Sequence, residues 1–243
     1  MNIEYHYKQA PIDMYTVVFI NGLLENKTSW EQTDKGKHIH IISKMKKKCS
    51  VLTFDFTHEH YKMDFIKLVN MIDDIIKDKV KSTKIIMVGH SIGGLITQVY
   101  GCLYPHKLKG IILIDSSTLN EFFKQRIIRD KQKCIDMNEI EIYDHWLSSW
   151  LSDFTQLPDI SKISSNIIVI AHLNIMSDYT NVIKHFYNND YELFYNDHKQ
   201  RFKYYKSITT RNCHSKTILH MDASHFIHYT NSEKIVDSIY ELV

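Results

Sequence analysis

Ser91 lies at the centre of Gly89-His90-Ser91-Ile92-Gly93, a Gly-x-Ser-x-Gly pattern. The apolar residues 85–88 precede it, and a segment that favours a helix follows it. A serine in a strained strand-to-helix turn needs small residues two positions before and after it. The chain has only 7 glycines, so the placing of Gly89 and Gly93 predicts such a turn. The chemistry this predicts is attack of the Ser91 hydroxyl on an acyl carbonyl.

A serine hydroxyl is a weak nucleophile until a base takes its proton. We expect His225 to be that base, because it follows the last predicted strand and precedes the last predicted helix. His228 is its nearest competitor among 15 histidines. His90 adjoins Ser91, but neighbouring side chains in a tight turn point apart, so we expect His90 to pack beneath the turn.

Apolar runs alternate with amphipathic segments along the chain, which predicts an α/β protein with a mostly parallel central sheet flanked by helices. The carboxyl ends of parallel strands form the usual site in such sheets. Asn21-Gly22, Ser91, Asp115 and His225 each lie at the end of a predicted strand or in the loop after it. The predicted strands are residues 3–7, 16–20, 50–55, 85–88, 110–115, 164–171 and 214–221, and the predicted helices are residues 30–48, 64–80, 92–104 and 232–242.

These features resemble the α/β-hydrolase family over most of the chain. Residues 17–24 with Trp30 are similar to the family's strand and oxyanion turn, with Asn21 where histidine is usual. Gly89 to Gly94 is similar to its nucleophile elbow, and residues 223–228 resemble its catalytic histidine loop. The order serine, acid, histidine along the chain agrees. The resemblance implies an α/β-hydrolase fold and a catalytic triad.

The acid of this triad has two main candidates. Asp115 ends a predicted strand directly, and some branches of the family place the acid there. The commoner position follows the next strand, where this chain has His172-Leu173-Asn174-Ile175 and no carboxylate before Asp178. We expect Asp115 to orient the imidazole, with Asp178 as the alternative and Asp190 behind both. The oxyanion hole would use the backbone N–H groups of Leu23 and Ile92.

Residues 117–163 interrupt the strand–helix rhythm. They are rich in helix formers and aromatic residues, including Trp146 and Trp150. We therefore predict a small helical lid at 117–163, inserted into a core made of residues 1–116 and 164–243. The alternative is an ordinary pair of helices packed on the sheet.

The composition excludes several other classes of protein. There is no Gly-rich phosphate loop and no dinucleotide fingerprint, so we expect no cofactor. The 4 cysteines are widely spaced, and the paired histidines 38/40 and 58/60 lack a metal-site pattern, so we expect no metal. The net charge of +2 indicates no partner, and the basic run 44–48 is typical of the solvated end of a helix, so we expect no nucleic-acid partner. No apolar run has the length of a transmembrane helix, so we expect no membrane partner. No leader segment is evident, and we expect a reduced, cytoplasmic protein.

The sequence therefore predicts a serine hydrolase of carboxylesterase or thioesterase type, acting on a small ester, thioester or amide. Two alternatives remain open. The same triad could serve a lyase or an acyltransferase, because a fold does not fix a reaction. The chain could also be a ligand-binding, hydrolase-like protein with little turnover.

Overall fold

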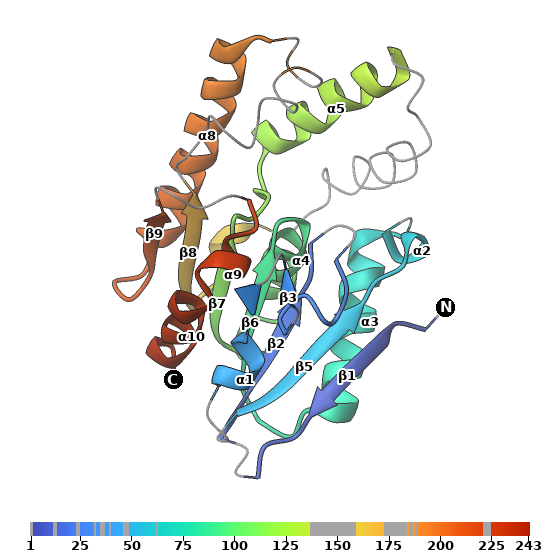
Figure 1. The fold of residues 1–243 in the computed structure, drawn as a ribbon, viewed down its shortest axis with the longest axis vertical. Helices are drawn as coiled ribbons and strands as arrows, with labels where there is room; N and C mark the ends of the chain where they lie inside the picture. Colours follow the sequence, from blue (N-terminus) through green and yellow to red (C-terminus); the bar gives the residue numbers. More distant parts are fainter. Residues whose placement is uncertain are drawn as a thin grey trace.

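A 7-stranded sheet runs through the middle of the molecule, and helices cover both of its faces in this computed structural model (Figure 1). The strand order is β1-β5-β2-β6-β7-β8-β9. β1 pairs antiparallel with β5, and the other pairs in this sheet are parallel. The strands are β1 Glu4–Lys8, β2 Tyr15–Ile20, β5 Cys49–Asp55, β6 Ile85–His90, β7 Leu108–Ile114, β8 Asn166–His172 and β9 Lys216–His220. The structure describes residues 2–11, 14–22, 25–31, 33–34, 37–38, 40–45, 49–61, 63–136, 159–172, 184, 187, 189–220 and 225–243.

Two hydrophobic cores lie on opposite faces of the sheet. Successive strand residues point to opposite faces, so Val18 and Ile20 of β2 join one core while Val17 and Phe19 join the other. The first core packs against α3, α4 and α8, and the second against α1, α9 and α10. The helices are α1 Ile41–Lys44, α2 His58–Tyr61, α3 Phe65–Lys79, α4 Ile92–Leu103, α5 Glu121–Asp136, α8 Tyr191–Thr209, α9 Ile227–Thr230 and α10 Ser232–Glu241, with 3-10 turns at Pro105–Lys107 and Ile160–Lys162.

The central strands are buried on both sides, which explains their continuous apolar sequences. All six residues of β2 and all six of β6 are buried. The helix predicted at 64–80 is α3, whose first turn is capped by the Asp64 carboxylate accepting from the Lys67 N–H. The mostly parallel sheet flanked by helices that the sequence predicted is therefore present.

The prediction of a helix over residues 30–48 is wrong. Only the short α1, Ile41–Lys44, is helical among the described residues of that range. Before it, β3 (Thr33–Asp34) pairs antiparallel with β4 (Lys37–His38). The dipeptide Lys35-Gly36 stands between these strands in the sequence, and glycine at such a position favours a turn over a helix.

α5 lies beyond the carboxyl ends of the strands, next to the upper half of α8 (Figure 1). An ion pair joins the two helices, with Arg129 Nη2 2.5 Å from Asp197 Oδ2. The predicted lid, 117–163, includes α5, but residues 137–158 lie outside the described residues, so the lid stays a prediction. No helix in the described part of the chain has the length and apolar character to cross a membrane.

Candidate active site

Ser91 sits at the sharp turn between β6 and α4. Its φ is 51°, a left-handed value that costs free energy for a residue with a side chain. The turn is held by the Ser91 N–H, which donates to the Ile114 carbonyl of β7 at 3.0 Å. A Cβ at Gly89 would come within 2.5 Å of the Gly93 carbonyl oxygen, and one at Gly93 would overlap the carbonyl of Ile20. The two glycines that predicted the turn are therefore sterically required there.

Asp115 follows β7 immediately and is fully buried. Its φ is 39°, and its N–H donates to the Ile170 carbonyl of β8 at 2.8 Å. The carboxylate meets three side chains: Oδ2 lies 2.5 Å from His225 Nδ1, and Oδ1 lies 2.9 Å from His172 Nδ1 and 3.1 Å from Arg201 Nη1. Burial alone would raise the pKa of Asp115, but the Arg201 charge and the two histidines hold that pKa well below its usual range. Asp115 is therefore a carboxylate at neutral pH.

His225 has one ring nitrogen fixed and the other available. Because ionised Asp115 only accepts, His225 Nδ1 must carry the proton, which leaves a lone pair on Nε2 when the ring is neutral. Burial lowers the pKa of His225; Asp115 opposes this effect, while the charges of His90 and Arg201 add to it. The net shift is downward, so His225 is a neutral imidazole near pH 7, the state in which it can accept a proton.

The histidine loop packs on the strand that ends at the serine. His90, the residue before Ser91, lies 4.8 Å from the His225 ring between centroids, and its Nε2 is 2.9 Å from the His225 carbonyl oxygen. Within the described residues, no hydrogen bond joins the Ser91 hydroxyl to His225. Such bonds are often formed only when substrate is bound.

The turn after β2 lies beside the turn at Ser91, since a Cβ at Gly93 would come within 2.3 Å of the Asn21 carbonyl oxygen. Asn21, which stands where the resemblance led us to expect histidine, is buried; it donates to the Phe54 carbonyl at 2.7 Å and accepts from Trp30 Nε1 at 2.6 Å. It thereby ties β2 to β5 and to the following loop. Leu23 lies outside the described residues. Ile92 is the first residue of α4, where backbone N–H groups have no partner inside the helix.

The other sequence candidates lie elsewhere. His228 is fully buried in α9, and its Nε2 is 3.0 Å from Glu25 Oε1 rather than at Asp115. Burial lowers the pKa of His228 to about 4. Asp190 caps α8 by accepting from the Leu193 N–H at 2.9 Å. Asp178 lies outside the described residues.

Sequence reasoning missed three polar side chains at this site. His172 ends β8 beside β7, so its approach to Asp115 could have been inferred from the convergence of adjacent parallel strand ends. Arg201 lies within α8, 86 residues after Asp115, and no local pattern points to it. Glu25 contacts both His90 and His228, and only the fold brings these three segments together.

Comparison with known families decides the classification. The family model described as the alpha/beta hydrolase fold matches residues 15–219. This chain belongs to the α/β-hydrolase fold family. The match includes β2, the turn at Ser91 and the strand end at Asp115, and it ends before His225. No curated protein sequence matches this α/β hydrolase.

Solved structures with the same fold cover nearly the whole chain. A structure from a study of carboxylesterases of Nitrososphaera gargenis superposes with a TM-score of 0.62 at 13% identity, covering 98% of this chain and 93% of its own. MenH from S. aureus gives 0.61 at 17% identity, with coverages of 98% and 97%. A thermophilic esterase from Thermogutta terrifontis gives 0.57 at 14% identity, with 98% and 92%. At these identities the likeness establishes the fold.

Proposed function

We propose that this α/β hydrolase is a serine hydrolase that cleaves a small ester, thioester or amide through an acyl-enzyme on Ser91. The observation that carries the proposal is the contact between Asp115 and His225 beside the strained turn at Ser91. Family membership and the esterases among the structural neighbours support a hydrolase, while the lyase and acyltransferase alternatives stay open because a fold does not fix a reaction.

In the first half of the reaction, His225 Nε2 takes the proton of Ser91 while Oγ bonds to the acyl carbon. The carbonyl oxygen becomes an oxyanion, stabilised by the N–H groups of Leu23 and Ile92, and losing one such donor costs about 3 kcal/mol. Asp115 stabilises the imidazolium that forms on His225. The imidazolium then gives its proton to the departing alcohol, thiol or amine, which leaves an acyl-enzyme.

In the second half, water replaces the leaving group. His225 takes a proton from the water while the water oxygen bonds to the acyl carbon. The N–H groups of Leu23 and Ile92 stabilise this second oxyanion as they do the first. Collapse of this intermediate breaks the bond to Ser91 Oγ, releases the carboxylic acid and returns the proton to Ser91.

A fluorophosphonate probe tests the proposal without knowledge of the natural substrate. We expect it to label the native chain at Ser91 and not to label Ser91→Ala, which should hydrolyse no p-nitrophenyl ester while keeping its melting temperature. His225→Ala should be about as inactive, and the double variant little worse, because the residues of a triad act as a unit. Absence of labelling in the folded native protein would favour the ligand-binding alternative.

A further inference from the structure

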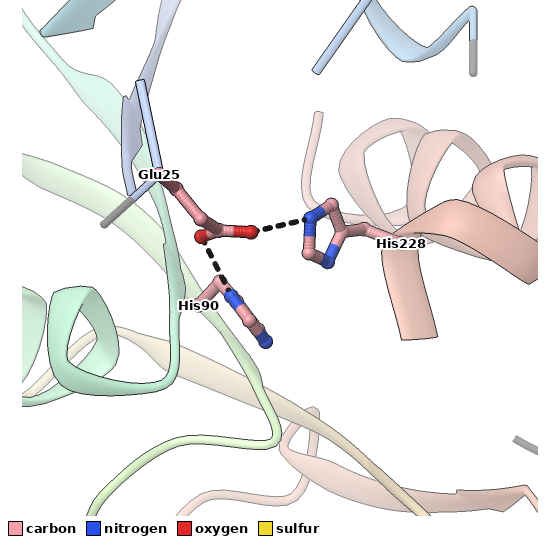
Figure 2. A group of neighbouring side chains, drawn as sticks. All are labelled: Glu25, His90 and His228. Carbon is pink, nitrogen blue, oxygen red and sulfur yellow. Dashed lines mark hydrogen bonds and ion pairs between the residues drawn. The ribbon is translucent and has the colours of Figure 1, made fainter. Parts of the chain in front are cut away.

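Three buried polar side chains meet behind the turn at Ser91: Glu25, His90 and His228 (Figure 2). Their side chains are 5%, 1% and 0% exposed. They come from the loop after β2, from the last residue of β6 and from α9, which are three separate parts of the candidate site. Figure 2 shows the Glu25 carboxylate between the two imidazole rings.

The two ring nitrogens of His90 both face hydrogen-bond acceptors. Nε2 lies 2.9 Å from the backbone carbonyl oxygen of His225, and Nδ1 lies 2.8 Å from Glu25 Oε2. A carbonyl oxygen accepts only, and so does an ionised carboxylate, so both nitrogens of His90 must donate. Only the imidazolium form has two N–H groups. An ionised Glu25 therefore requires a positive charge on His90, with Glu25 as its counter-ion.

The surroundings of Glu25 fit the same arrangement. Its Oε2 also accepts from the Gly22 N–H at 2.5 Å, and its Oε1 faces His228 Nε2 at 3.0 Å and the Tyr229 hydroxyl at 3.5 Å. Burial alone would raise the pKa of Glu25, but the two histidines hold that pKa far below its usual range. Burial likewise lowers the pKa of His90, and the Glu25 charge more than reverses this. His228 stays neutral, and its Nε2 lies 3.0 Å from Glu25 Oε1.

We propose that Glu25 and His90 form a buried carboxylate–imidazolium pair that positions the catalytic groups on both sides of Ser91. His90 holds the backbone of His225 through its carbonyl oxygen, and Glu25 holds the turn at Gly22, next to the expected oxyanion donor. Both are positioning residues, and this role rests on the function proposed above.

The charge on His90 also acts on the proposed base. Among the described residues, the charged and titratable groups that act on His225 include Asp115, Arg201, His90 and His228. Asp115 favours protonation of His225, whereas Arg201 and the His90 imidazolium, 4.8 Å away between ring centroids, disfavour it. Removing the His90 charge should therefore raise the pKa of His225.

A divalent cation is the competing explanation for this cluster, since its three ligand atoms lie within 4.8 Å of one another. Ligands of one tetrahedral zinc ion lie about 3.3 Å apart, from Zn–N and Zn–O lengths near 2.0 Å. The observed 2.8 Å and 3.0 Å between Glu25 and the two histidines are hydrogen-bond distances instead. This spacing favours a proton between the groups over a metal ion.

The charge state of His90 can be measured in the native chain without any turnover. In ¹⁵N-histidine NMR, we expect one buried histidine to keep two ring N–H groups from pH 6 to pH 9, and this signal to be absent from His90→Gln. A neutral His90 with one N–H at pH 7 would overturn the proposal. Loss of the two-proton signal on adding stoichiometric zinc chloride would do the same and would assign the cluster as a metal site.

The positioning role needs a variant that leaves no lone buried charge. In Glu25→Gln/His90→Gln, we expect the rate of fluorophosphonate labelling at pH 7 to fall roughly 10- to 100-fold, the loss expected from a small misplacement of reacting groups. The midpoint of its pH dependence should move upward. The matched control is His60→Gln, another buried histidine, whose ring is hydrogen-bonded to Thr57. It should leave both quantities unchanged.

A purely structural role predicts a different outcome. The melting temperature would fall, while the labelling rate per folded molecule and its pH midpoint stayed at native values, and that result would overturn the proposal. If the double variant does not fold, Glu25→Asp is the second test, because it keeps the negative charge but withdraws the carboxylate from Gly22. It should slow fluorophosphonate labelling without moving the midpoint of the pH dependence. A native labelling rate in Glu25→Asp would count against the positioning role. Failure of the native chain to label would refute the proposed function, while the NMR measurement still decides the ion pair.

Discussion

Replacement of Asp115 by asparagine changes one atom at the centre of three contacts. The carboxylate faces donors from His225, His172 and Arg201. An asparagine has one acceptor oxygen and one NH₂ group, so it cannot accept from both His225 and Arg201 in the same way. If its NH₂ faces His225, the imidazole proton must move to Nε2, the atom that should accept the proton of Ser91.

Two magnitudes follow from this geometry. In triads, the wrong imidazole tautomer lowers kcat by about 10⁴-fold, or about 5.5 kcal/mol of transition-state stabilisation. Arg201, whose side chain is 13% exposed, also loses its ion pair with the Asp115 carboxylate. Breaking such a pair costs about 3 kcal/mol, which lowers the melting temperature of a chain of this size by about 10 °C.

The assay combines hydrolysis of a p-nitrophenyl ester, fluorophosphonate labelling and thermal unfolding followed by circular dichroism. Asp190→Asn is the matched control, because Asp190 caps α8 and asparagine caps a helix equally well. Asp178→Asn should also change kcat little. An Asp115→Asn enzyme within tenfold of the native kcat would refute the assignment of the acid, and a large loss in Asp178→Asn would transfer the role to Asp178.

Three further predictions concern the glycine turn, the base and a buried aspartate. Gly93→Ala should lower the free energy of unfolding in urea by about 3 kcal/mol, because the new Cβ overlaps backbone atoms. Gly110→Ala should cost less, because its Cβ meets only the movable side chain of Leu242. Equal losses in the two variants would contradict this reasoning. The pKa of His225 is lowered, so the labelling rate should rise with pH through a midpoint below the ordinary histidine value, and a midpoint above that value would be inconsistent with the site. Asp73 is buried, and its Oδ1 lies 2.5 Å from Lys107 Nζ, a contact that lowers the pKa of Asp73. The stabilisation from ionised Asp73 is therefore complete above the ordinary aspartate pKa and is lost as the pH falls through the lowered pKa of the folded state. Asp73→Asn should therefore lower the melting temperature at pH 7 and remove part of the acid sensitivity of the native chain, and an unchanged melting temperature would show that the ion pair contributes nothing.

The sequence predicted the features that depend on local spacing. The turn at Ser91 follows from Gly89 and Gly93, since the backbone leaves no room for other side chains there. The parallel strands follow from apolar runs buried on both faces, and the family match and the sheet confirm that fold. The placing of Asp115 near His225 followed from the convergence of parallel strand ends.

What the sequence could not predict depends on contacts between distant segments. Arg201 reaches Asp115 from a helix, and Glu25 reaches His90 across 65 positions of the chain, so neither contact leaves a periodic signal. The helix expected at 30–48 failed for a local reason instead. Lys35-Gly36 stands between β3 and β4 in the sequence, and a glycine there favours a turn over a helix.

One helix connects the proposed triad to the region above it. On α8, Asp197 and Arg201 are four residues apart and so lie on the same side of the helix; the first pairs with Arg129 of α5 and the second with Asp115. A displacement of α5 would act on α8 through the Arg129–Asp197 ion pair, and α8 also carries Arg201, one of the three side chains that keep the pKa of Asp115 low. The position of α5 and the charge on the proposed acid are therefore coupled through one face of α8.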